Sequence, residues 1–405
     1  MRGASATGLA VVLGAVCLST FRQHSCSAEP NVNYANDLSA FFVELDAHYP
    51  FFDLKDIRKE WERKKPLWLK AAQRAKADAE FARIVIEAMK CLRDAHLSFT
   101  DLKVKLPPEP EFYPGLSLMP AAKNRVVVLA TSPNLASTLK SGMVITKIDG
   151  QSARKLLEAR SVASWQAGGH FSSPQRARFF AYRFALSGKR GDKHTIHYLD
   201  GKQERSLELV STLEADDWPH NYHQPPALEQ SAKSVWHAAI ESTGYIYLRR
   251  IDESVADGVR KAIDAHAGVT SWIVDLSGNT GGGYDDALLA EFKRLTQPVA
   301  VIIDAGCISA GETVARDLVR IANARLFGET TAGSSSSKKE WAFPSGFARV
   351  RYSVDSRKGA DGKLIEFNGI VPHEFVEADP SEVQAGKNSG IERALVYLRA
   401  TKKPR

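Results

Sequence analysis

Residues 299–328 read VAVIIDAGCISAGETVARDLVRIANARLFG, and this stretch decides the fold class. The apolar run Val299–Asp304 predicts a buried strand, and the apolar side chains of residues 310–321 recur with helical spacing. The segment Arg325–Gly328 predicts another strand after the helix. Strand, helix and strand in succession indicate a layered α/β domain, in which helices cover a sheet.

The same alternation extends on both sides of this stretch and predicts an α/β core over residues 244–405. No repeat of the solenoid type is visible in the sequence. The other elements expected in the core are strands at residues 245–248, 272–276 and 348–354, helices at residues 254–267 and 284–295, and a last strand after residues 366–376.

Two regions of different pattern precede this core. Residues 29–105 carry apolar side chains at helical spacing, most clearly from Phe81 to Leu92, and predict a helical N-terminal region. Residues 106–212 hold short alternating strands, which predict a β-rich domain. The proline-containing residues 213–243 are expected to form a linker to the core.

The β-rich region resembles a PDZ module. Its strands, a short segment of small residues and the turn Ile148-Asp149-Gly150 follow one another in the order of that module. The resemblance implies that Gly115 and Leu116 lie in a loop whose backbone amides bind a chain-terminal carboxylate, although an ordinary turn fits them equally well. Residues 161–188 depart from the pattern and predict a helical insertion.

The chain begins with the pattern of a cleavable secretory signal. Residues 8–20 are apolar and uncharged, follow Arg2, and give way to the small residues 26–28. This run is too short to span a bilayer, which takes about 20 residues. We therefore expect residues 1–28 to be a signal peptide, and the mature protein to be exported, periplasmic or secreted, without a stable membrane span. An uncleaved anchor or a buried N-terminal helix is the alternative.

Composition excludes several classes of protein. The chain is 44% hydrophobic and 25% charged, close to the average for globular domains. Its formal net charge of +7 comes without a long run of like charges or an RNA-binding motif, so no nucleic-acid partner is expected. Cys91 and Cys307, the cysteines beyond the leader, lack metal-ligand spacing and could form one disulfide or stay free. No metal and no cofactor are predicted.

Ser309 is the candidate nucleophile. The segment Ile308-Ser309-Ala310-Gly311-Glu312 follows an apolar strand and opens a helix, so the Ser309 hydroxyl is expected among the free N–H groups of a helix N-terminus. The alternative is purely structural, because Ser309 with Glu312 three residues later is also the sequence of a capping box.

Three further sites could complement Ser309. The glycines of residues 281–283 follow a predicted strand and would let backbone amides approach a ligand, or would simply form a tight turn. They lack the lysine and the spacing of nucleotide-binding loops. His96 is expected to point inward and could act as a general base or as a core histidine. Glu366 would by default be a surface carboxylate.

Taken in order, these motifs resemble the tail-specific, or C-terminal-processing, family of serine peptidases, over essentially the whole mature chain. The resemblance implies a crotonase-like α/β core, a PDZ module that binds an unstructured protein tail, and peptide hydrolysis through an acyl-enzyme. The motifs are Asp94-Ala95-His96, Asp275-Leu276 with Asn279 to Gly283, Ser309 to Glu312, Gly328-Glu329-Thr330, and Glu366 with Gly369 to Pro372.

The family has two catalytic versions, and this sequence resembles the tricorn-like one. Ser334 stands where the dyad version has its lysine, whereas His96 and Glu366 match the histidine and glutamate of the other version. The resemblance therefore implies Ser309 as nucleophile, His96 as general base and Glu366 as the acidic member, in direct or relayed contact. It also implies an oxyanion hole formed by the amides of Ala310 and of Gly282 or Gly283.

Three positions depart from the family pattern. Ala95 replaces a serine that could relay between the histidine and the acid, His373 replaces an aspartate, and the serines of residues 334–337 predict a flexible segment. The function implied is an exported serine endopeptidase acting on unfolded or tail-exposed polypeptides. A non-catalytic binding module on the same fold is the alternative, and an acyl-CoA enzyme of the crotonase type would leave the leader and His96 unexplained.

Overall fold

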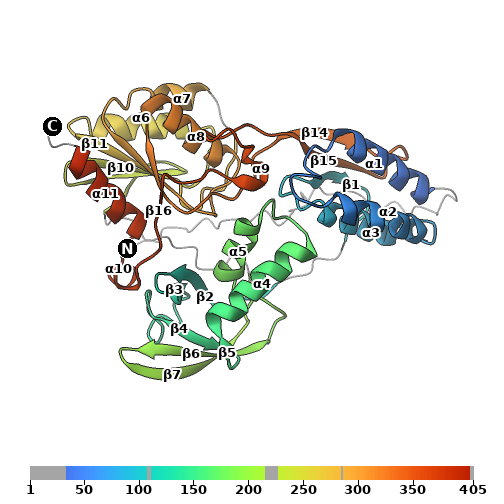
Figure 1. Cartoon of the computed structure of the whole chain (residues 1–405), viewed down its shortest axis with the longest axis horizontal. Helices are drawn as coiled ribbons and strands as arrows, with labels where there is room; N and C mark the ends of the chain where they lie inside the picture. Colours follow the sequence, from blue (N-terminus) through green and yellow to red (C-terminus); the bar gives the residue numbers. More distant parts are fainter. Residues whose placement is uncertain (1–32, 107–110, 215–226, 284–285, 402–405) are drawn as a thin grey trace, which may run out of the picture. The chain divides into compact units, whose positions relative to one another are not determined.

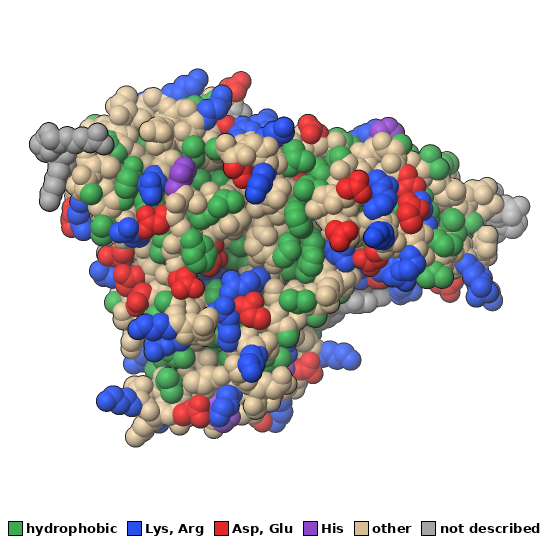
Figure 2. All heavy atoms as spheres, viewed as in Figure 1, with side chains coloured by type: hydrophobic (Ala, Val, Ile, Leu, Met, Phe, Trp, Pro, Cys, Tyr) green, Lys and Arg blue, Asp and Glu red, His purple; other side chains and the backbone are tan. Residues whose placement is uncertain are grey.

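The computed structural model describes residues 33–106, 111–214, 227–283 and 286–401. The predicted signal peptide lies outside the described residues. The chain forms two compact units, each built from separate stretches of sequence (Figure 1). Unit 1 comprises the residues up to Pro110 together with Gln166–Phe171 and Ser336–Asp355, and unit 2 comprises the rest. On the face seen in Figure 2, basic and acidic side chains are interspersed.

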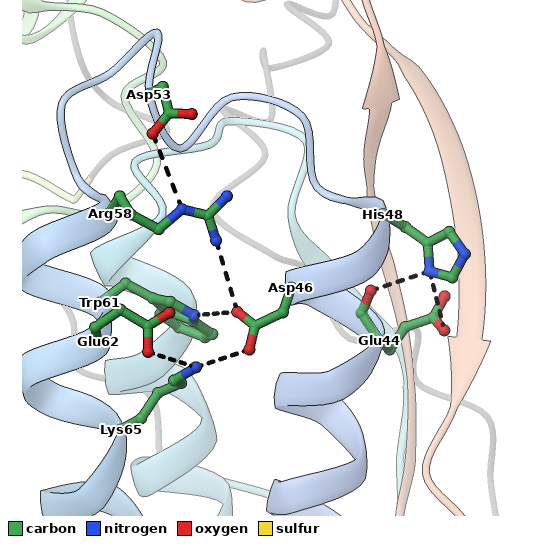
Figure 3. A network of polar contacts seen from close by, with 8 residues as sticks. All are labelled: Glu44, Asp46, His48, Asp53, Arg58, Trp61, Glu62 and Lys65. Atoms are coloured by element: carbon green, nitrogen blue, oxygen red, sulfur yellow. Dashed lines mark hydrogen bonds and ion pairs between the residues drawn. The ribbon is translucent and has the colours of Figure 1, made fainter.

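Unit 1 contains the predicted helical region. Its helices are α1 (Tyr34–His48), α2 (Arg58–Ala72) and α3 (Asp78–Cys91). Asp46 joins α1 to α2, because its carboxylate accepts hydrogen bonds from Trp61 Nε1 (2.7 Å) and Lys65 Nζ (2.7 Å) (Figure 3). Buried aromatic side chains, including Phe41, form the core of this unit.

A three-stranded antiparallel sheet completes unit 1, in the order β1 (Ser98–Leu102), β15 (Ala348–Asp355), β14 (Ser337–Ala342). This differs from the sequence prediction, which placed residues 348–354 in the α/β core. The pairing of β1 with β15 joins strands about 250 residues apart, and no local pattern in the sequence reports such a partner.

Unit 2 is built on a seven-stranded sheet. Its central strands pair in parallel from β10 to β16, while β9 and β8 add antiparallel strands at one edge. The strand order is β16 (Glu374–Phe375), β13 (Arg325–Gly328), β12 (Val299–Ile303), β11 (Ser271–Asp275), β10 (Thr243–Leu248), β9 (Val235–Ile240) and β8 (Glu229–Ala232).

Helices cover both faces of this sheet, as the alternation of strand and helix predicted (Figure 1). Val301 packs in one core with α6 (Val255–Ala265), α7 (Asp286–Phe292) and α8 (Ala310–Ala322). Its neighbour Ile302 packs in a second core with α11 (Ser389–Thr401). Successive strand residues point to opposite faces, so each face is buried by its own helices.

The predicted linker, residues 213–243, is corrected by the structure. Its residues 215–226 lie outside the described part of the chain, but the remainder contains β8 and β9, which belong to the seven-stranded sheet. Strand β9 pairs with β10 over its whole length, from Val235 opposite Leu248 to Ile240 opposite Thr243.

Unit 2 also contains an inserted module, from β2 to β7, with a hydrophobic core of its own. One sheet pairs β2 (Leu116–Ala121) with β3 (Arg125–Thr131). The other has the order β5 (Gln151–Ser152), β4 (Ile145–Ile148), β6 (Lys193–Asp200), β7 (Gln203–Val210). The predicted helical insertion corresponds to α4 (Ala153–Ala167) and α5 (Pro174–Arg183).

Two short helices, α9 (Ile365–Asn368) and α10 (Pro380–Gln384), complete unit 2. In the described residues we find no helix with both the length and the apolar character needed to cross a bilayer.

Candidate active site

Ser309 lies at the N-cap of α8, after a loop that leaves the end of β12. Its φ of 54° and ψ of −118° are strained for a residue with a side chain, and such strain persists only where the surroundings hold it. The loop is held by Asp304, whose Oδ1 accepts the N–H groups of Gly278 (2.8 Å), Gly306 (2.9 Å) and Cys307 (3.1 Å). The fold thus fixes the backbone of the predicted nucleophile.

Glu312 organises the backbone around Ser309. Its buried carboxylate accepts four hydrogen bonds, one of them from the Ser309 N–H (3.0 Å), which is the glutamate half of the capping box. The other three donors are the Thr331 hydroxyl (2.6 Å), the Gly333 N–H (2.8 Å) and the Ser334 N–H (3.0 Å). Burial, and to a smaller extent the charge of Glu366, raise the pKa of Glu312 to about 7.

The segment after β13 is ordered around this carboxylate, which corrects the flexibility expected from its serines. Ser334 is fully buried, and its carbonyl accepts the Ser309 N–H (2.9 Å). Ser335 is also buried. Among the described residues, the Ser334 Oγ has no hydrogen-bond partner. Backbone polar groups of this segment therefore bind the nucleophile and Glu312.

The three glycines differ in what their amides do. The Gly281 N–H donates to Asn279 Oδ1 (2.9 Å), and the Gly283 N–H donates to the Ile251 carbonyl (3.1 Å). The hydrogen bonds of the described residues include no acceptor for the N–H of Gly282 or of Ala310. A Cβ at Gly281 would lie 2.7 Å from Ser309 Cβ, so the glycine turn lies directly against the nucleophile.

Glu366 is buried in the same unit, in the kinked helix α9. Its N–H donates to the Ser356 hydroxyl (2.9 Å), which in turn donates to the Ser335 carbonyl (2.7 Å). The surface position expected by default for this carboxylate is therefore wrong. Both Glu312 and Glu366 are fully buried, and the charge of Glu366 contributes to the raised pKa of Glu312.

His96 lies in unit 1, in the turn between α3 and β1, and is partly buried. Its Nδ1 is 3.2 Å from the Ser336 hydroxyl, which is 2.6 Å from the Ser353 hydroxyl. Burial first, and the charge of Lys338 second, lower the pKa of His96 to about 4. The imidazole is therefore neutral at pH 7, as a general base must be.

Ser336 is a residue that the sequence interpretation missed. It supplies a hydroxyl at Nδ1, although Ala95 removes the relay expected from the family pattern. An Nδ1–H donated to this hydroxyl would leave Nε2 as the basic nitrogen. The run of serines at residues 334–337 was the available signal, but nothing local indicates that one of them reaches a histidine.

The structure places the predicted site residues in two groups. Unit 2 holds Ser309, Ala310, Glu366 and the glycines, while unit 1 holds His96. Cys91 and Cys307 are buried free thiols, so they do not form the disulfide that the sequence left open. In the inserted module, Gly115 has a φ of 82° and Leu116 begins β2.

A cavity of about 220 Å³ opens in unit 2 at the ends of β12 and β13. Its lining includes Leu118 and Met119 of β2, Phe179 of α5, and Asp304, which holds the nucleophile loop. Ligands of open α/β sheets commonly bind at the carboxyl ends of the strands. The cavity therefore connects the inserted module with the nucleophile loop.

The sequence is similar to those of known peptidases. Residues 284–376 match the sequence model of peptidase family S41. Over 158 residues the chain is 28% identical to the carboxy-terminal processing protease CtpA of Bacillus subtilis (strain 168), a stretch that covers 32% of this chain and 34% of that protein. The chain thus matches about a third of the length of this curated relative.

Solved structures share the fold. Mature CPAF has a TM-score of 0.63 at 12% identity, over 92% of this chain and 98% of CPAF. A candidate peptidase from Parabacteroides merdae ATCC 43184 has a TM-score of 0.51 at 12% identity, over 91% and 97% of the two chains. The predicted resemblance to the tail-specific peptidases is confirmed by the match of residues 284–376 to the model of peptidase family S41 and by the stretch shared with the processing protease.

Proposed function

We propose that this chain is a serine peptidase of the S41 type, which hydrolyses peptide bonds through an acyl-enzyme on Ser309. The observation that carries the proposal is the strained backbone of Ser309 at the start of α8, beside two amides, of Ala310 and Gly282, that have no acceptor among the described residues. Unpaired amides next to a nucleophile are what an oxyanion hole requires.

In the proposed mechanism His96 accepts the Ser309 proton as Oγ attacks the peptide carbonyl. The amides of Ala310 and Gly282 stabilise the oxyanion, and removal of one such donor typically slows the reaction by about 10² to 10³. His96 then protonates the leaving amine, and a water molecule, deprotonated by His96, hydrolyses the acyl-enzyme. Of the two predicted glycine donors we keep Gly282, because Gly283 donates to Ile251.

Glu366 serves as the acidic member of the charge network. It is buried among groups that contact the nucleophile segment, since Ser356 hydrogen-bonds both the Glu366 N–H and the Ser335 carbonyl. We propose that this carboxylate, in direct or relayed contact, favours the imidazolium that forms when His96 takes the proton. Glu312, by contrast, is saturated by four donors and fixes the backbone.

The substrate class follows from the inserted module. We infer that it is a PDZ-like domain on a crotonase-like core, and that the loop at Gly115 and Leu116 binds the free carboxylate of an unfolded polypeptide tail. The cavity shared by β2, α5 and the nucleophile loop supports a path from that loop toward Ser309. Residues 1–28, as a signal peptide, would bring the enzyme to exported substrates.

A fluorophosphonate probe followed by mass spectrometry tests the nucleophile. We expect labelling at Ser309, and loss of both labelling and peptide hydrolysis in Ser309→Ala, with an unchanged circular dichroism spectrum. Ser337→Ala, at the exposed start of β14, is the control and should keep both activities. Absence of labelling in the wild-type protein would favour the non-catalytic binding module instead.

A further inference from the structure

The turn that carries His96 is held in a strained shape by its own unit. Arg93 has a φ of 47°, a conformation that a residue with a side chain keeps only when its surroundings fix it. Its carbonyl accepts a hydrogen bond from Lys55 Nζ (2.8 Å), and Asp94 Oδ1 accepts the His96 N–H (2.8 Å). We call residues 93–96 the histidine turn.

A segment far away in the sequence binds this turn. The insertion loop, Gln166–Phe171, comprises the last residues of α4 and the first part of the connection to α5, and it belongs to unit 1. One oxygen, the Lys90 carbonyl, accepts both the Arg93 N–H (3.1 Å) and the Gly169 N–H (2.9 Å). The first residue of the histidine turn and the insertion loop therefore share an acceptor.

The Arg93 side chain makes the second connection. Its Nη2 donates to Glu60 Oε2 (2.9 Å) and to the Gln166 carbonyl (3.2 Å). Arg93 is only 8% exposed, and a guanidinium is buried at low cost only when charged and polar partners surround it. Arg93 therefore links α2, the histidine turn and the insertion loop.

The loop needs a glycine to approach so closely. Gly168 has a φ of 79°, and a Cβ at this position would lie 2.3 Å from the Lys90 oxygen. Any larger residue would push the loop away from the oxygen that also holds Arg93. An ordinary connection between two helices has no such requirement, because connecting segments normally run over the surface in contact with water.

We propose that the insertion loop is a positioning element for His96, with Arg93 as its positioning residue, an inference that rests on the proposed role of His96 as general base. The loop restrains the histidine turn through the Lys90 carbonyl and the Arg93 side chain. The imidazole then keeps one orientation toward the hydroxyl of Ser336. A displacement of about 1 Å in a catalytic group can cost about 10²-fold in rate.

Displacement of the turn would also change the surroundings of the imidazole. The charges that act on His96 include Asp94, which raises its pKa, and Lys338, Lys55 and Arg351, which lower it together with burial. Since burial is the largest of these causes, a loosened turn should let water reach the ring and raise the pKa of His96 from about 4 toward its ordinary value.

Gly168→Ala in the full chain tests the proposal, with Gly191→Ala as matched control. Both glycines have a positive φ, 79° and 90°, but a Cβ at Gly191 meets nothing within 4 Å. We expect NMR titration of His96 to give a higher pKa in Gly168→Ala, the rate of Ser309 labelling to fall about 10-fold or more, and KM to change little. Gly191→Ala should match the wild type in all three.

A loop that only stabilises the fold would lower the melting temperature of Gly168→Ala and leave the His96 titration and the labelling rate as they are, which would overturn the proposal. Arg93→Lys provides a second variant if Gly168→Ala fails to fold, because it keeps the charge and loses the forked donor. The NMR titration needs no activity, so it remains decisive even if wild-type protein is not labelled and the proposed function itself fails.

Discussion

Four hydrogen-bond donors surround the Glu312 carboxylate, which is fully buried. The donors favour the charged form, whereas burial and Glu366 favour the neutral one, and the balance raises its pKa to about 7. An acid whose pKa is higher in the folded than in the unfolded state binds its proton more tightly when folded. Its protonation therefore stabilises the fold as pH falls from about 7 toward its ordinary value.

This balance predicts a measurable pH dependence of stability. In urea unfolding, the free energy of unfolding should fall between pH 5 and pH 7.5, with Glu312 contributing up to about 3 kcal/mol of that difference. Glu312→Gln cannot titrate, so its pH dependence should be flatter by this amount. Glu340→Gln, at an exposed position of β14, should keep the wild-type dependence. Parallel curves for wild type and Glu312→Gln would rule out the assignment.

Among single residues, the sequence indicated the proposed nucleophile and base but not the residues that hold them in place. Ser309 and His96 stand in motifs whose order resembles that of one family. Each motif contains one residue of a type suited to its role, a serine as nucleophile and a histidine as base. The residues that fix them have weaker signals. Asp304 is simply the first polar residue after a buried strand, and Ser336 is one serine among four. Their roles depend on contacts across the fold.

Among the elements, the glycine turn after β11 has the sharpest requirement. Gly282 has a φ of 136°, and a Cβ there would lie 1.8 Å from the Ile251 carbonyl oxygen. Gly283, its neighbour, has space for a side chain, with nothing within 4 Å of a Cβ. The turn therefore tolerates substitution at one of two adjacent positions, although the sequence alone does not distinguish them.

Gly282→Ala and Gly283→Ala form a matched pair that tests the oxyanion hole. We expect Gly282→Ala to lower kcat by about 10² to 10³, because the displaced amide no longer faces the oxyanion. Gly283→Ala should stay within a few-fold of the wild type, since its amide binds Ile251. Steady-state kinetics on a fluorogenic peptide measures both. Equal losses in the two variants would argue that the whole turn, rather than the Gly282 amide, is needed.

The elements that the sequence predicted well are those with a strong local period. Strand β12 and helix α8 follow directly from the apolar run and the helical spacing of residues 299–328. The sequence did not predict strand β14, and it placed the residues of β8 in a linker. The residues of both strands are largely polar and exposed or partly exposed. The position of each strand in its sheet depends on its partner, β9 for β8 and β15 for β14. Pairing across long sequence separations leaves no local signature.

In the whole molecule, the proposed catalytic groups belong to two units, and each unit is built from several separate stretches of the chain. Ser335 belongs to unit 2 and Ser336 to unit 1, so the chain passes from the nucleophile segment to the histidine segment within one peptide bond. The insertion loop likewise enters unit 1 between two helices of unit 2. A division into consecutive domains, which the sequence suggested, does not describe such a chain.

Tail capture is a property of the intact chain and is tested with substrates. Two peptides of the same sequence, one with a free and one with an amidated C-terminus, differ only in the charge that the loop at Gly115 would bind. We expect the free acid to have a KM lower by about 10-fold, because a hydrogen bond to a charged group contributes about 1.5–3 kcal/mol. The value of kcat should stay similar.

Gly115→Ala shows whether the module is responsible. A Cβ at this position would lie 2.1 Å from Ser132 Oγ, and the φ of 82° disfavours any side chain, so the loop must rearrange. The variant should lose the preference for the free acid and hydrolyse both peptides with the KM of the amidated one. Gly150→Ala, at a turn of the same module with a φ of 75° and open space around it, should retain the preference. If Gly115→Ala and wild type discriminate equally, the carboxylate is recognised elsewhere, and catalysis on Ser309 would remain as proposed.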